Sequence, residues 1–177
     1  MYKRQANQVS STIKGDLSSR DFSINSIAFL FDNKSLFDPL NGLKDLELSM
    51  LRTHSEKNLF NDPLRILRCF RFVSELSFKI DLTLITFIKK NQGKLYLVAN
   101  ERINYEIQKI VKGANALDAV MLLKKFNIFG SDNFYEDPFF LDLILSEIFF
   151  PISIALKGTT ISISISSVTL SKIISLI

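Results

Sequence analysis

The 177-residue sequence is short of the residues that build disulfides and metal sites, because it has one cysteine, Cys69, and one histidine, His54. A single cysteine excludes an intramolecular disulfide, and these two side chains alone cannot complete a tetrahedral zinc site. Cys69 lies among apolar residues, so packing is its expected role. No signal peptide is expected, because the basic residues 1–10 are followed by no apolar stretch.

One apolar stretch, residues 139–156, has the length of a membrane-spanning segment. Asp142, Glu147 and Pro151 interrupt it, and each acid would be costly at the centre of a bilayer. We interpret this stretch as a buried helix and expect no membrane partner; a membrane segment is the alternative.

Charge is unevenly distributed along the chain, whose net charge is +4. Residues 1–113 hold 18 Lys and Arg against 12 Asp and Glu, whereas residues 114–177 hold 4 against 6. The first region is therefore the candidate for a phosphate-bearing partner. A solvated surface without any partner would have the same composition.

Turn and capping residues predict an α+β fold that begins with short strands. The expected elements are a strand without a clear start in residues 1–14, a helical turn capped by Asp16 that runs through Arg20, a hairpin of strands 24–31 and 35–38, and a helical turn at 44–48.

Helices are expected from residue 55 onward. They are 63–76 with Asp62 as N-cap and Pro63 first, 82–91 capped by Asp81, 101–113 capped by Asn100 and closed by Gly113, and an amphipathic helix at 115–129. Residues 151–177 are a low-complexity tail, in which Ile/Ser alternation from residue 161 to 166 has the period of an exposed edge strand.

The helix after Asp62 carries Arg65, Arg68 and Arg71 at intervals of three residues. Asp62 and Arg65 lie about 60° apart on such a helix. A carboxylate accepts hydrogen bonds and a guanidinium donates them, so this pair suits cytosine and adenine, which present an amino donor beside a ring-nitrogen acceptor. The later arginines suit a triphosphate. A solvated helix face is the alternative.

Five segments, in order, resemble the class II tRNA nucleotidyltransferases, the family that includes CCA-adding enzymes and bacterial poly(A) polymerases. They are "DLSSRDFSINSIAF", "DPLNGLKDL", "FNDPLRILRCFRF", "FKIDLTLITFI" and "NERINYEIQKI", and together they cover roughly residues 10–113. The resemblance implies the remnant of a nucleotidyltransferase head, followed by an α-helical neck and body.

The resemblance also assigns roles to residues. The family's base-reading motif Glu-Asp-x-x-Arg corresponds to Asn61, Asp62 and Arg65, with Asn61 in place of the glutamate. Arg68 and Arg71 match arginines that bind nucleotide in relatives.

The family's Arg-Arg-Asp and following Asn correspond to Ser19, Arg20, Asp21 and Asn25, and Ser19 departs from the pattern. The resemblance places Asp21 at the ribose and Arg20 at the ribose or phosphates; capping and salt bridging are the alternative for both. Asp38 and Gly42 match a hinge, and we interpret Glu101 and Arg102 as structural.

Two family features are missing from the sequence. Relatives hold the triphosphate with a Gly-Gly turn and bind Mg²⁺ with an Asp-x-Asp pair. This sequence has no Gly-Gly, and Asp137 and Asp142 have the wrong spacing and position for the metal pair. We therefore expect no catalytic and no metal-binding residue in this chain, and no activity from the chain alone.

These observations predict a partial head at 1–54, a nucleotide- and RNA-binding helical neck at 55–113, a partial helical body at 114–150 and the tail at 151–177. The expected function is addition of C and/or A to the 3′ end of tRNA or another RNA, with ATP and CTP as substrates. The chain would be a fragment of such an enzyme, or one part of a split enzyme whose missing head segment is a separate chain. The alternative is a non-catalytic remnant that binds nucleotide or RNA. The cytoplasm or an organelle is the expected location.

Overall fold

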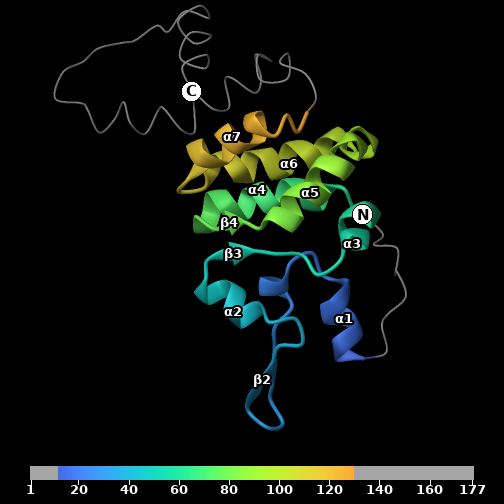
Figure 1. Cartoon of the computed structure of the whole chain (residues 1–177), viewed down its shortest axis with the longest axis vertical. Helices are drawn as coiled ribbons and strands as arrows, with labels where there is room; N and C mark the ends of the chain where they lie inside the picture. Colours follow the sequence, from blue (N-terminus) through green and yellow to red (C-terminus); the bar gives the residue numbers. More distant parts are fainter. Residues whose placement is uncertain (1–11, 130–177) are drawn as a thin grey trace, which may run out of the picture.

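The computed structural model describes residues 12–129, which form helices and short strands (Figure 1). This arrangement confirms the α+β class. The α-helices are α1 (Ile13–Ser19), α2 (Gly42–Glu47), α3 (Glu56–Asn61), α4 (Leu64–Leu76), α5 (Leu82–Asn91), α6 (Asn100–Lys112) and α7 (Ala116–Lys125). The 3₁₀ helices are η1 (Ser23–Asn25) and η2 (Gln92–Leu97), and the strands are β1 (Ala28–Leu30), β2 (Ser35–Phe37), β3 (Met50–Leu51) and β4 (Lys79–Ile80).

Several expectations concern residues 1–11 and 130–177, which lie outside the described residues. They include most of the expected first strand, the apolar stretch 139–156 and the tail. Residues 13 and 14, at the end of that expected strand, are helical. Within residues 12–129, no helix is both long and apolar enough to cross a membrane.

The predicted hairpin is present as the antiparallel pair β1–β2, which projects away from the helices (Figure 1). Its first strand is shorter than expected, because residues 23–25 form a 3₁₀ turn before it. A second pairing, parallel and between β3 and β4, was not predicted. It joins the first part of the chain to the helices through hydrogen bonds from the Lys79 and Asp81 amides to the Ser49 and Leu51 carbonyls, at 2.9 and 3.0 Å.

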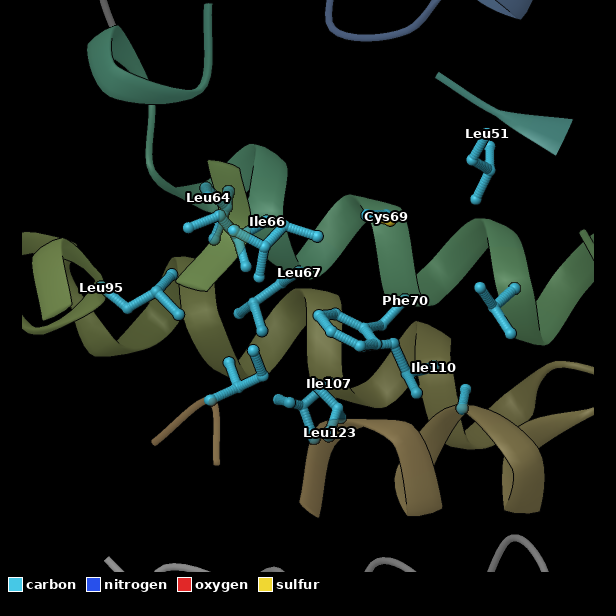
Figure 2. Close-up of a cluster of buried hydrophobic side chains, with 14 of the residues drawn as sticks. Leu51, Leu64, Ile66, Leu67, Cys69, Phe70, Leu95, Ile107, Ile110 and Leu123 are labelled. Atoms are coloured by element: carbon cyan, nitrogen blue, oxygen red, sulfur yellow. The ribbon is translucent and has the colours of Figure 1, made fainter. Parts of the chain in front are cut away.

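The core lies where α4 packs against α6 and α7 (Figure 2). Leu67 and Phe70 of α4, Ile110 of α6 and Leu123 of α7 are fully buried. The apolar stripe predicted for α4 therefore faces two helices at once. Cys69 is buried in the same cluster, as its expected packing role requires, and burial raises the pKa of its thiol.

The helix caps were only partly predicted. Asp81 caps α5 by accepting a hydrogen bond from the Thr83 amide at 3.0 Å, as expected. The cap expected at Asp16 is wrong, because α1 starts earlier and Thr12 accepts from the Gly15 amide at 3.2 Å. Asn100 is the first residue of α6 and makes no capping bond.

Gly113 ends α6, as predicted, and also lets α6 approach α4 closely. A Cβ atom at this position would lie 2.0 Å from the Ser74 Oγ atom. Ser74 itself donates a 2.5 Å hydrogen bond to the Ile110 carbonyl, and the Asn115 amide donates to the Ser74 carbonyl at 2.8 Å. These contacts fix where α4, α6 and α7 meet.

Candidate functional site

A hollow of about 550 Å³ lies between the segment after α1, the start of α4, and α6. Six of the seven residues predicted to bind nucleotide lie around it. It is lined by Arg20, Asp21, Asn25, Asp62, Leu64, Arg65, Arg68, Phe72, Arg102 and Glu106. Four of these side chains are arginines and three are carboxylates, so the hollow can both donate and accept hydrogen bonds.

Asp62 and Arg65 are side by side at this hollow. Asp62 has extended backbone between α3 and α4, and its carboxylate lies 4.0 Å from the Nε atom of Arg65. The prediction that Asp62 caps α4 is wrong: Pro63 holds that position, without a side-chain capping bond. Because the Asp62 side chain makes no capping bond to α4, its carboxylate can face the hollow.

The Arg65 guanidinium reaches across to the segment after α1. Its Nη1 atom donates a 2.9 Å hydrogen bond to the carbonyl of Ser19, the residue that departs from the family pattern. This bond joins the neck helix to the segment that carries Arg20 and Asp21. A ligand that used this nitrogen of Arg65 would have to replace the Ser19 carbonyl as acceptor.

Asp21 is buried and fully engaged by neighbouring donors. Its carboxylate accepts hydrogen bonds from the Phe22 amide at 3.1 Å, the Asn25 amide group at 3.0 Å and the Nε atom of Arg68 at 2.5 Å. Burial acts to raise the pKa of Asp21, but the hydrogen bonds from Asn25 and Arg68 and the charges of Arg68 and Arg65 outweigh it, so the pKa lies below its ordinary value. Asp21 therefore stays ionised and fixes Arg68 beside the hollow.

The segment that carries Arg20 is held by α3. Asn58 donates hydrogen bonds to the carbonyls of Ser18 and Arg20 at 3.0 and 2.7 Å. The Arg20 guanidinium binds the Asn25 carbonyl at 2.7 Å and the Asp16 carboxylate at 2.9 Å. Both bonds lie near the surface, so Arg20 can exchange them for a ligand at little cost.

Arg71 is the one predicted nucleotide-binding residue that does not line the hollow. It is buried, and its Nη1 atom lies 3.1 and 3.0 Å from the two carboxylate oxygens of Glu106 on α6. Its guanidinium also lies over the Phe72 ring, 5.1 Å from the ring centre. The structure thus shows Arg71 joining α4 to α6, and contact with a nucleotide stays a prediction.

The two expected hinge residues have well-defined local contacts. Asp38 accepts hydrogen bonds from the Gly42 and Leu43 amides at 2.7 and 2.9 Å, and so closes the first turn of α2. A Cβ atom on Gly42 would lie 2.2 Å from the Ser23 carbonyl oxygen, so glycine is needed for close packing. Movement about these residues stays a prediction.

The Mg²⁺ implied by the resemblance finds no ligands in the described part of the chain. Residues 12–129 contain no group of three His, Cys, Asp or Glu side chains that could hold a metal ion. Asp21 is taken up by Asn25 and Arg68, and Asp62 stands between two arginines. Both of these carboxylates are thus already paired with basic side chains.

Sequence reasoning did not place two charged residues at the hollow, Arg102 and Glu106, nor the apolar Leu64 and Phe72. The two charged residues come from α6, four residues apart and thus on one side of that helix. The Nη2 atom of Arg102 lies 3.3 Å from the Asp62 carboxylate. The local sequence does not show which helix α6 packs against. The sequence therefore indicated only that Arg102 and Glu106 share one face of α6.

Comparison with known proteins identifies the relatives of this arrangement. Residues 1–52 match the family "Poly A polymerase head domain". The CC-adding tRNA nucleotidyltransferase of Shouchella clausii is 36% identical over 115 residues, which is 64% of this chain and 30% of that enzyme.

Two solved structures share the fold. The Bacillus stearothermophilus CCA-adding enzyme in complex with CTP is 32% identical with a TM-score of 0.62, over 66% of this chain and 30% of that one. The Thermotoga maritima CCA-adding enzyme complexed with tRNA is 32% identical with a TM-score of 0.63, over 67% and 30%. The chain spans about 30% of the length of these relatives, and it belongs to the class II tRNA nucleotidyltransferase and poly(A) polymerase family.

Proposed function

We propose that the hollow binds a nucleoside triphosphate with a cytosine or adenine base, and that the chain supplies the base-selecting part of an enzyme that adds C and/or A to the 3′ end of tRNA. The observation that supports this most is the pairing of Asp62 with Arg65 at a hollow that also holds Arg20 and Arg68. Asp62 would accept from the amino group of the base, and Arg65 would donate to the ring nitrogen.

The remaining residues of the hollow have roles in the same proposal. Arg68, fixed by Asp21, would meet the phosphates, and Arg20 would exchange its surface bonds for the ribose or phosphates. Related CCA-adding enzymes have been solved in complex with CTP, with ATP and with tRNA.

Catalysis would require more than this chain holds, because its sequence contains no Gly-Gly and no Asp-x-Asp. When bound by such a carboxylate pair, Mg²⁺ would activate the RNA 3′-hydroxyl and neutralise the leaving pyrophosphate. We propose that these parts come from a separate polypeptide. A non-catalytic nucleotide- or RNA-binding protein is the second candidate, favoured by the missing carboxylate pair.

Nucleotide titrations of the 177-residue chain, followed by NMR at millimolar concentration, test the proposal. CTP and ATP should bind more tightly than UTP and GTP. Arg65→Ala should weaken CTP and ATP about ten- to a hundredfold, the value of a hydrogen bond to a charged group. Arg68→Ala should weaken all four nucleotides alike, and Lys109→Ala on α6, which does not line the hollow, is the control. Equal binding of the four nucleotides to the wild-type chain would refute base selection.

A further inference from the structure

Arg102 is the cation nearest to the carboxylate that would read the base. Its Nη2 atom lies 3.3 Å from Oδ1 of Asp62, whereas the Nε atom of Arg65 lies 4.0 Å from Oδ2. The two arginines thus approach different oxygens of one carboxylate. Sequence reasoning interpreted Arg102 as structural, but its side chain is 47% exposed and lines the hollow.

Asp62 has few other restraints on its side chain. Its carboxylate makes no capping bond to α4. The preceding residue, Asn61, stands where relatives have glutamate; it is exposed, and its side chain makes no hydrogen bond within residues 12–129. Arg65 cannot restrain Asp62 firmly either, because its Nη1 atom is bound to the Ser19 carbonyl.

Arg102, in contrast, projects from a firmly placed helix. One turn further along α6, the buried Glu106 binds Arg71 of α4, and beyond it the Ile110 carbonyl accepts from Ser74. Because residues four apart share a helix face, the contacts that place Glu106 against α4 also direct Arg102 toward Asp62.

We infer that Arg102 is a positioning residue: by binding one oxygen of Asp62, it keeps the other oxygen turned toward Arg65 and the hollow, and so sets the preference for bases that carry an amino group. A carboxylate oxygen has two lone pairs, so Asp62 can accept from Arg102 and from a base together. This inference rests on the proposed function, because it concerns how the same site selects its ligand.

The test measures a selectivity ratio, the affinity for CTP and ATP relative to UTP and GTP. Arg102→Ala should lower this ratio about two- to fivefold, the range expected for a half-exposed ion pair. Arg102→Lys keeps the charge and one donor, so it should restore the ratio to within about twofold of wild type. Lys109→Ala, on the same helix, should leave the ratio unchanged. Circular dichroism verifies that each variant is folded.

A double-mutant cycle separates positioning from a general effect. If Arg102 acts through Asp62, then Arg102→Ala should have no further effect on the ratio in an Asp62→Ala background. An unchanged ratio in Arg102→Ala, or an equal loss of affinity for all four nucleotides, would overturn the inference. Failure of the proposed function is seen separately, as a wild-type chain that does not distinguish the four nucleotides.

Discussion

Arg71→Ala should destabilise the fold, and this outcome would distinguish Arg71 from the arginines of the hollow. The side chains of Arg71 and Glu106 are 10% and 5% exposed, and two short contacts join them. Removal of one partner leaves the other charge buried without compensation, which costs about 3–5 kcal/mol. That is a large fraction of the roughly 5–15 kcal/mol that stabilises a domain.

Urea denaturation followed by circular dichroism measures this loss. The free energy of unfolding should fall by about 3–5 kcal/mol in Arg71→Ala. The double substitution Arg71→Met with Glu106→Leu should recover most of the loss, because well-packed apolar residues can replace a buried ion pair. Arg20→Ala is the matched control: it breaks an ion pair with Asp16 whose side chains are 44% and 57% exposed, and it should cost less than about 1 kcal/mol.

The reasoning would be refuted if Arg71→Ala lowered the free energy of unfolding no more than Arg20→Ala does, and yet strongly lowered the affinity for nucleotides. That pattern would mean that Arg71 leaves Glu106 to bind phosphate, as its place in the arginine series suggests. A large loss of stability with Glu106→Gln as well would support the structural role, because the same pair is broken from the other side.

Three further outcomes are expected. With Mg²⁺, CTP, ATP and tRNA lacking its 3′ end, the chain alone should add no nucleotide, because loss of a two-metal site costs several kcal/mol of barrier lowering; robust extension on a gel would contradict this. Gly113→Ala should lower the free energy of unfolding by about 1–3 kcal/mol through the clash with Ser74. Gly93→Ala is the control and should not destabilise the fold, because a Cβ atom there meets nothing within 4 Å. Equal effects of the two substitutions on urea denaturation would refute the packing argument. The pKa of Asp21 is lower in the folded chain than in the unfolded chain, where it is about 3.9. Ionised Asp21 therefore adds to the free energy of unfolding above a pH of about 3.9, and this stabilisation is lost as the pH falls through the folded-state pKa. The melting temperature of Asp21→Asn should thus depend less on pH below about 4 than that of wild type, and parallel plots of melting temperature against pH would exclude the effect.

Local signals in the sequence predicted the elements that local chemistry determines. The hairpin, the Asp81 cap and the end of α6 at Gly113 follow from turn and capping residues within a few positions. The prediction of a cap at Asp62 was wrong because a tertiary contact competes for its carboxylate. Arg102, forty residues away in the sequence, binds this carboxylate in place of the backbone amides of α4.

Long-range pairing was beyond what a single sequence specifies. The parallel contact of β3 with β4 involves two residues in each strand, too few to leave an alternating pattern. Arg102 and Glu106 enter the hollow only because α6 packs on α4, and amphipathicity reveals a buried face without revealing its partner.

The arginine series shows why spacing alone does not define a site. Each step of three residues turns the side chain by about 300°, so Arg68 lies about 60° and Arg71 about 120° from Arg65 around the helix. A single hollow can therefore collect Arg65 and Arg68, while Arg71 has rotated into the contact with α6. Arg71 still affects the hollow, because it contacts Glu106 of α6, and α6 places Arg102 beside the carboxylate of Asp62. One arginine series thus has two roles in this fold: Arg65 and Arg68 line the hollow, and Arg71 holds α6, whose Arg102 contacts Asp62.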